Sequence, residues 1–346
     1  MSLRFIDSFD HYQTADITKK WTAISAYGGG VIEAGGRNGN CLHMANGGFA
    51  SLTLDAQSTW VIGFAYKTST SERKPITDVL DVGDLQVTLR LNADNTLSVV
   101  RGSHTTGTEL GKSVSALSND TWYYIELKIT IGNSGSYQVK VNNVNWIASA
   151  VGDTQATANA TANRVRLYCA TGVSGNYYDD LYVCDGQGTY NKNFLGDCRV
   201  QAIFPDANGA NNDFTGSDSD STDNYALVQE KATDFPDDDA TYVQSLTVGH
   251  KDTYLFEDVA YAEGETAIAG IQVLVCDKKT AAGPMTICPV VRVGAADYDG
   301  VAVAPSEGSY SYMRQVYGCT PDANADQWTP DNLAVAEIGH KIVSVT

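Results

Sequence analysis

Long apolar runs, prolines and histidines are scarce in this chain. It has only 8 prolines and 5 histidines among 346 residues. No run approaches the ~18 apolar residues that cross a membrane as a helix. The first residues reach Asp7 and Asp10 before the apolar stretch of a signal peptide could begin. We therefore expect no membrane insertion, and a protein that stays in the cytoplasm where it is made unless it leaves as part of a larger particle.

Positive charge is scarce as well. Lys and Arg number 23 against 41 Asp and Glu, so the formal net charge is −18. A chain of this charge repels polyanions, which argues against nucleic acid and anionic membranes as partners. The acids are densest over 206–239, where they either favour solubility or bind cations.

The cysteines lack the paired spacing of a zinc site. They stand at positions 41, 169, 184, 198, 276, 288 and 319, and no two form C-x-x-C. Cys276 and Cys288 could face each other across a hairpin that turns at 278–285, which would allow a disulfide. In a reducing compartment we expect buried free thiols instead.

Catalytic patterns are missing too. Glycoside hydrolysis needs two carboxylates that point into one cleft. The most regular strand pattern holds only Glu126, with Lys128 beside it, while Glu263 and Glu265 flank Gly264 in an expected loop. The isolated histidines, without H-x-x-x-H spacing or an adjacent serine elbow, are His11, His43, His104, His250 and His340. We expect no enzymatic activity.

Glycine and tyrosine, by contrast, are abundant, with 32 and 19 residues. The clearest apolar alternation runs over 121–131 and, after a glycine turn at 132–135, over 136–141, which predicts a hairpin inside a sheet. Residues 60–66 place large side chains on one face and small ones on the other, as in a closely packed central strand. No 3.6-residue period is long enough for a packed helix, so we expect an all-β protein.

Four segments of the first half carry a resemblance to a known fold. They are Asp7-Ser8-Phe9-Asp10-His11-Tyr12, Trp122-Tyr123-Tyr124-Ile125-Glu126-Leu127, Tyr137-Gln138-Val139-Lys140-Val141-Asn142 and Tyr178-Asp179-Asp180-Leu181-Tyr182-Val183. Together they resemble the strands of a concanavalin-A-like (laminin-G-like) jelly roll. The resemblance covers 1–188 and implies a two-sheet sandwich there.

A second domain is expected over 197–346, after a hinge at 189–196. It is expected to form another β-sandwich, in which a strand stops at Pro205 because proline cannot donate to a ladder. Its expected strands are Cys198–Phe204, Tyr225–Gln229, Ala240–Val248, Thr253–Phe256, Ile268–Cys276, Thr286–Val293, Tyr310–Tyr317 and Ala334–Val343. Segments 206–213 and 235–239 are expected loops, and 328–332 a turn or a single helical turn.

Motifs in this second half resemble a module of tailed-bacteriophage structural proteins. In chain order they are Phe194-Leu195-Gly196-Asp197, Arg199-Val200, Pro205, Asp237-Asp238-Asp239-Ala240-Thr241-Tyr242-Val243, Gly270-Ile271-Gln272-Val273, Trp328-Thr329 and Glu337-Ile338-Gly339. The resemblance spans 190–346 and implies a tail, fibre or head-decoration component of the virion. Long fibres carry a repetitive shaft, which this sequence lacks, so a shaft role is not expected.

Two sets of residues are candidates for ligand binding. Aromatic rings stack on sugars, and Trp21, Tyr27 and Tyr177 are the candidates for that contact. Asp206, Asn208, Asn211 and Asp213 place oxygens at short spacing, either to stabilise a turn or to bind calcium.

The expected function is that of a non-enzymatic virion structural protein. It would be displayed on the particle surface, attach to other virion proteins and assemble as a symmetric homo-oligomer, a trimer in the favoured case. It would act by binding through surface complementarity, and the sequence does not identify the ligand. A receptor-binding tail protein that recognises a host-surface carbohydrate is one form of this function. The alternatives are a head-decoration protein without a glycan ligand and a carbohydrate-active enzyme. Calcium is the only cofactor suggested.

Overall fold

A computed structural model describes residues 2–25, 30–173, 175–231, 235–260 and 267–346. The chain divides into two compact units, Met1–Val200 (unit 1) and Gln201–Thr346 (unit 2). The boundary thus differs from the expected hinge at 189–196. Strands dominate both units, which confirms the all-β expectation, and none of the described helices is long and apolar enough to cross a membrane.

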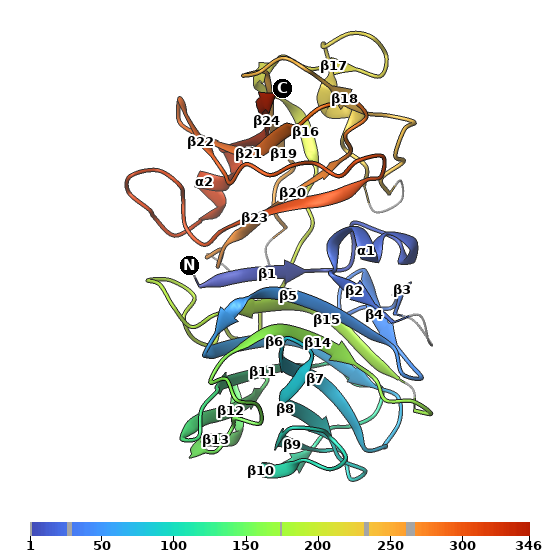
Figure 1. The fold of residues 1–346 in the computed structure, drawn as a ribbon, viewed down its shortest axis with the longest axis vertical. Coiled ribbons are helices and arrows are strands. Elements are labelled where there is room, and N and C mark those ends of the chain that lie inside the picture. The colour runs from blue at the N-terminus through green and yellow to red at the C-terminus, as the bar shows by residue number, and fades with distance from the viewer. Residues whose placement is uncertain (1, 26–29, 174, 232–234, 261–266) are drawn as a thin grey trace. The chain divides into compact units, whose positions relative to one another are not determined.

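Unit 1 is a sandwich of two antiparallel sheets (Figure 1). Sheet A has eight strands: in spatial order β13 (Val144–Gly152), β12 (Gly135–Val141), β11 (Tyr123–Thr130), β6 (Thr59–Thr68), β15 (Asn176–Cys184), β4 (Asn40–Met44) and β3 (Val31–Ala34), with β1 (Leu3–Asp7) also paired to β15. Sheet B has seven: β10 (Thr108–Ala116), β9 (Thr96–Arg101), β8 (Asp84–Leu91), β7 (Lys74–Asp81), β14 (Ala162–Tyr168), β5 (Phe49–Gln57) and β2 (Ala23–Ile24). Two short helices follow β1, namely η1 (Thr14–Asp16) and α1 (Ile17–Lys20).

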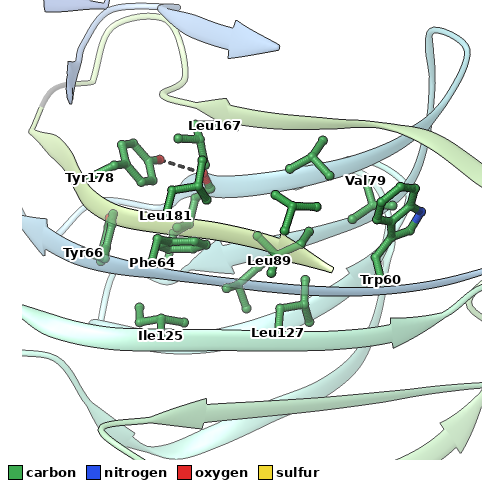
Figure 2. Close-up of a cluster of buried hydrophobic side chains, with 14 of the residues drawn as sticks. Trp60, Phe64, Tyr66, Val79, Leu89, Ile125, Leu127, Leu167, Tyr178 and Leu181 are labelled. Carbon is green, nitrogen blue, oxygen red and sulfur yellow. Dashed lines mark hydrogen bonds between the residues drawn. The ribbon is translucent and has the colours of Figure 1, made fainter. Parts of the chain in front are cut away.

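Alternating apolar side chains build the core between the two sheets. On β6, the side chains of Trp60, Ile62, Phe64 and Tyr66 are all fully buried in it. Figure 2 shows residues of β6, β11 and β15 meeting residues of β7, β8 and β14. Each such side chain contributes about 1.5–3 kcal/mol when it leaves water. The expected strands at 60–66, 121–131 and 136–141 are confirmed as β6, β11 and β12.

Strand β15 changes partners at an irregularity in its middle. Its first half pairs with β4 and its second half with β1, while β6 runs along its other edge. The register against β6 shifts between Asp179 and Tyr182, and Asp180 has a positive φ of 49°. This β-bulge turns both carboxylates of the Asp179–Asp180 pair away from the core.

Unit 2 contains one five-stranded sheet and two strand pairs (Figure 1). Sheet C has the order β16 (Pro205–Asn212), β19 (Lys251–Phe256), β24 (Glu337–Val345), β21 (Met285–Val293) and β22 (Ala296–Asp299). The pairs are β20 (Ile271–Asp277) with β23 (Ser311–Tyr317) and β17 (Thr215–Gly216) with β18 (Val243–Gln244). Its short helices are η2 (Asn224–Leu227) and α2 (Pro330–Ala334).

The core of unit 2 lies between the β20–β23 pair and sheet C. Val273 of β20 shares one apolar cluster with Val291 of β21 and Ile338 of β24, around the fully buried Trp328. Unit 2 is therefore layered, with sheet C on one side and a narrow second layer on the other. The motif residue Trp328 is a core residue whose indole N–H donates to the carbonyl of Tyr317.

Three expected strands of unit 2 are wrong in whole or in part. Residues 198–204 form no strand, and Pro205 begins β16 instead of ending a strand. Within unit 1, the Cys198 carbonyl accepts from Arg37 and the Val200 N–H donates to Asp180. Residues 225–229 overlap helix η2, whose Tyr225 N–H donates to the side chain of Asn208. Within 240–248, only Val243–Gln244 is a strand.

The remaining motif residues of unit 2 have structural roles. The Glu337 carboxylate accepts from the Thr253 hydroxyl at 2.6 Å and from the Ala210 N–H at 2.7 Å, and so ties β24 to β19 and β16. A Cβ atom on Gly339 would overlap the carbonyl of Asp252, so only glycine fits this crossing of strands. Thr329 caps α2 through the Asn332 N–H.

The hairpin expected between Cys276 and Cys288 is also wrong. Cys276 on β20 lies opposite Tyr312, and Cys288 on β21 lies opposite Lys341. The two cysteines thus belong to different sheets.

Candidate functional site

The outer face of sheet A, the side away from the core, has a floor of small residues on β6. Gly63 has the ring of Tyr182 directly above it, since a Cβ atom there would overlap the ring. Tyr182 reaches from β15 across β6, and its hydroxyl donates to the Glu126 carboxylate on β11 at 2.5 Å. The sequence pattern of 60–66 predicted this close packing on the second face.

Residues 193–200 lie over this floor, and we call them the covering segment. The Gly196 N–H donates to Glu126 at 2.9 Å, and the Leu195 N–H donates to the Tyr182 hydroxyl at 3.2 Å. The Val200 N–H donates to Asp180 at 2.7 Å. Both Glu126 and Tyr182 are only 1% exposed as a result.

The geometry explains why Glu126 is not available for chemistry at the surface. Its Oε1 atom accepts two hydrogen bonds, one from a tyrosine and one from a backbone N–H of the covering segment. A general acid or nucleophile has to contact substrate, and this carboxylate is shielded from solvent, with its Oε2 atom buried and without a hydrogen-bond partner in the described structure. Glu126 is an anchor for the covering segment.

Arg37 fastens the covering segment at its other end. Its Nε donates to Asp180 at 2.8 Å, and its terminal nitrogens contact the Asp197 carboxylate and the Cys198 carbonyl. The guanidinium lies 5.2 Å from the centre of the Tyr124 ring. One arginine thus links the 35–40 loop, the bulge of β15 and the covering segment.

Two buried carboxylates next to Arg37 hold the 35–40 loop through its backbone. Asp179 accepts from the N–H groups of Arg37 and Asn38, and Asp10 accepts from the Asn40 N–H. Burial raises the pKa of Asp179 to about 8, helped by neighbouring Asp180, and burial raises the pKa of Asp10 to about 6. The oxygens of both carboxylates accept backbone donors, so these two side chains hold the loop in place.

The first aromatic candidate, Trp21, is buried, which contradicts its expected role as a surface for sugar. Only 2% of it is exposed, and its indole N–H donates to the Asp7 carboxylate at 2.9 Å. Asp7 also accepts from the Tyr12 hydroxyl at 2.8 Å and pairs with the Lys20 ammonium at 3.0 Å. Trp21 therefore belongs to a buried polar cluster with Asp7, Tyr12, Lys20 and His11.

Acid is expected to destabilise unit 1 through His11. Burial lowers its pKa to about 3, Lys20 lowers it further and Asp7 opposes. Because the ordinary value is 6.5, the unfolded chain binds the proton first, and stability falls as the pH drops below that value. The stability advantage of wild type over His11→Gln should shrink by about 1 kcal/mol between about pH 6 and pH 5, in urea unfolding at both pH values. Titrations shared by both proteins, such as that of Asp10, cancel, and a constant difference would contradict the assignment.

Tyr177, the second aromatic candidate, is half-buried on the outer face of sheet A, and both faces of its ring are in contact with protein. The His43 ring stacks on it at 4.2 Å and 8°, and the Lys67 ammonium lies 4.5 Å from its centre. Lys67 also lies 4.9 Å from the Trp122 ring. Tyr177 offers a ligand its edge and hydroxyl and has no bare face for stacking. Tyr27 lies outside the described residues.

Residues 206–212 of the oxygen-rich segment lie in strand β16 and not in the expected loop, and Asp213 follows the strand. Asn208 receives the Tyr225 N–H and donates to the carbonyl of Thr222, while Asp213 receives the Lys251 N–H. Asn211 donates to the Thr253 hydroxyl, and Asp206 is exposed. Asn208, Asn211 and Asp213 thus bind neighbouring parts of unit 2. The calcium expectation on these residues stays a prediction.

A different set of carboxylates gathers nearby. Asp218, Asp220 and Asp223 are exposed, and their carboxylate oxygens lie within 4.8 Å of one another. Asp218 and Asp220 also accept backbone N–H groups two residues on, as turn residues do. Their D-x-D-x-x-D spacing was the sequence signal that could have singled them out.

The outer face of sheet B carries a polar network that the sequence analysis missed. Arg166 on β14 binds Asp78 on β7 with Nε at 2.9 Å and Nη2 at 2.5 Å. Asp78 also accepts from the Thr88 hydroxyl of β8 at 2.6 Å. The Arg166 guanidinium lies 4.6 Å from the Tyr168 ring and 5.7 Å from the Phe49 ring.

Two further arginines meet at a loop above this network. Arg73 and Arg90 both donate to the carbonyl of His104, at 2.9 and 3.2 Å, and Arg73 also donates to that of Thr105. Arg90 pairs with Glu109 at 2.5 Å. These residues come from separate strands and loops, so no local spacing in the sequence could have revealed the cluster.

Comparisons with known proteins concern unit 1. No family model and no curated protein matches the chain. Unit 1 is a sandwich of two antiparallel sheets, as expected for a jelly roll. Similar solved structures include the cellulose induced protein Cip1, with 14% identity over 52% of this chain and 96% of that chain and a TM-score of 0.39. Another is domain 4 of AbnA, a GH43 extracellular arabinanase from Geobacillus stearothermophilus, in complex with arabinotriose. It has 15% identity over 53% of this chain and 92% of that chain, with a TM-score of 0.39.

Another similar structure is the endo-β-1,4-glucuronan lyase from Trichoderma reesei, with 11% identity over 47% of this chain and 90% of that chain and a TM-score of 0.38. The SAP-like pentraxin from Limulus polyphemus has 14% identity over 38% of this chain and 65% of that chain, with a TM-score of 0.31. The fold alone does not decide between catalysis and binding.

Proposed function

We propose that this chain is a non-enzymatic structural protein of a tailed-phage virion, displayed on the particle surface and binding host-surface carbohydrate through unit 1. Unit 2 attaches it to other virion proteins. The virion setting is supported by the motif resemblance over 190–346, whose residues Trp328, Thr329, Glu337 and Gly339 all stabilise unit 2. Such residues identify a module, and they leave its surface available to partners.

The single observation that carries the non-enzymatic part is the burial of Glu126. It is the one carboxylate on the outer face of β11, it is 1% exposed, and the covering segment binds it. A retaining glycosidase needs two carboxyl groups about 5 Å apart at the substrate. Binding needs only an accessible polar and aromatic surface, which the outer face of sheet B supplies at Arg73, Tyr168 and Arg166.

Labelled antibody on intact particles tests the virion part. Gold-coupled antibody against the purified chain is imaged by electron microscopy on particles from the lysate in which the chain is produced. Label at the tail or collar supports adsorption to the host, and label on the head supports decoration. Antigen in the lysate without label on any particle contradicts the virion proposal.

A matched assay tests the absence of catalysis. Host polysaccharide is incubated with the purified chain, and reducing sugars and unsaturated sugar ends are measured. We expect neither product, while the polysaccharide is retained on immobilised protein. Product formed by wild type would overturn the non-enzymatic proposal, and its loss in Glu126→Gln would place the chemistry at Glu126.

The proposed oligomer is a trimer. Strand β13, at one edge of sheet A, exposes Val144 and Val151 to 61% and 75%, and an exposed apolar edge strand favours pairing with another chain. Light scattering after gel filtration should give three times the 37.0 kDa of one chain. A Val151→Lys variant should lower this mass, whereas a monomeric mass for wild type would contradict the trimer.

A further inference from the structure

Three arginines surround the loop of sheet B that contains His104, although the chain as a whole is acidic. Arg73, Arg90 and Arg166 face two carboxylates, Asp78 and Glu109, which pair with Arg166 and Arg90. Positive charge is thus in local excess on a protein of net charge −18. A surface of this sign attracts anions that the rest of the molecule repels.

Arg73 is the arginine whose charge is not matched. It is exposed, and it forms no ion pair with a carboxylate in the part of the chain that the structure describes. Its Nη2 donates to the carbonyls of His104 and Thr105, which fixes the plane of the guanidinium. Nε and Nη1 have no acceptor among the described residues, so their N–H groups are available to the oxygens of an anionic ligand as single charge-assisted hydrogen bonds.

The neighbours of Arg73 suit a sugar ring that bears this carboxylate. The ring of His104 contacts the half-buried Tyr168 at 6.2 Å, and the hydroxyls of Ser103 and Thr105 hydrogen-bond each other at 3.0 Å beside them. Burial lowers the pKa of His104, the three arginines lower it further and Asp78 opposes, so its imidazole is neutral at pH 7. Neutral hydroxyl and imidazole groups exchange hydrogen bonds with sugar hydroxyls.

We propose that the outer face of sheet B binds a carboxylate-bearing sugar of an acidic polysaccharide, with Arg73 as the carboxylate-binding residue and His104, Thr105 and Tyr168 at the sugar. The proposal rests on the glycan binding proposed above and names its chemical class. Arg166 and Arg90 add long-range attraction, and their own carboxylate partners keep them in place.

Binding of three carboxylated polysaccharides tests the proposal. Polygalacturonate, alginate and polysialate are titrated into the full chain by calorimetry, beside neutral dextran and polyglutamate. At least one carboxylated polysaccharide should bind more tightly than dextran and polyglutamate, and its affinity should fall with added salt. Arg73→Gln should weaken this binding about tenfold or more, which corresponds to the loss of a charged hydrogen-bonding partner.

Two variants control for folding and for charge. Lys112→Gln removes a cation of β10 that already pairs with Asp94 at 2.8 Å, and it should leave affinity unchanged. Thr105→Glu keeps Arg73 and its backbone contacts but offers the guanidinium a competing carboxylate, and it should weaken binding as Arg73→Gln does. Unchanged circular dichroism and unfolding midpoints show that both variants are folded.

The outcomes separate this proposal from the broader one. Equal binding of dextran and acidic polysaccharides, insensitive to Arg73→Gln, overturns the carboxylate site and leaves glycan binding in place. Equal binding of polyglutamate overturns the recognition of sugar. If none of these polymers binds and host polysaccharide is not retained either, both proposals fail.

Discussion

Replacing Asp7 with alanine is expected to lower the free energy of unfolding of unit 1 by about 3–5 kcal/mol. Asp7 is fully buried and neutralises Lys20, whose side chain is 1% exposed. The burial of Asp7 opposes ionisation, but Lys20, His11 and the Phe9 N–H outweigh it and hold the carboxyl pKa below its ordinary value. Without Asp7, the ammonium, the Tyr12 hydroxyl and the Trp21 N–H lose their common acceptor.

Urea unfolding of the isolated variants measures this effect. The control is Asp55→Ala, because Asp55 pairs with Arg4 at the surface and its side chain is 57% exposed. Surface pairs contribute about 0–1 kcal/mol. Replacing both partners, as in Asp7→Ala with Lys20→Met, should restore part of the loss, since the buried ammonium is then removed together with the carboxylate that neutralises it. An Asp7→Ala effect no larger than that of Asp55→Ala would show that the buried pair is not formed.

The second large effect is expected for Gly63→Ala, which should cost about 1–3 kcal/mol. The added methyl group would overlap the Tyr182 ring, so the ring has to move. Its hydroxyl then leaves Glu126 and the Leu195 N–H, which loosens the covering segment. We expect the amides of Leu195 and Gly196 to exchange hydrogen faster in the variant.

Gly83→Ala is the matched control, because an added Cβ at Gly83 meets nothing within 4 Å. Its stability should lie within about 0.5 kcal/mol of wild type, as for ordinary surface substitutions. Faster exchange at the covering segment in both variants, or in neither, would disprove the contact between Tyr182 and β6 as its cause.

The sequence predicted what depends on local alternation. The hairpin expected at 121–131 and 136–141 is β11 and β12, because one face of each strand is buried and the pattern has period two. The same rule failed at 198–204, where alternating residues form no strand. The first residues of this segment bind side chains that are distant in the sequence, since the Cys198 carbonyl accepts from Arg37 and the Val200 N–H donates to Asp180.

Candidate site residues were harder to predict, for the same physical reason. Aromatic side chains are equally suited to cores and to sugars, and Trp21 is in the core because Asp7 accepts its indole N–H. Arg73, Arg90 and Arg166 approach one another only because β7, β8 and β14 are neighbours in sheet B or lead into its loops. Single-sequence patterns do not contain such long-range pairings.

The covering segment has a mechanical consequence. Unit 2 begins directly after Val200, so tension on the C-terminal unit reaches the sandwich through the bonds at Val200, Cys198 and Gly196, one after another. Hydrogen bonds that bear the force one at a time break at low force. The hydrogen bonds between paired strands share the force and therefore withstand more of it. Release of residues 193–200 would lengthen the chain by roughly 27 Å while the strands of unit 1 stay paired, so the segment would extend under load before the sandwich unfolds.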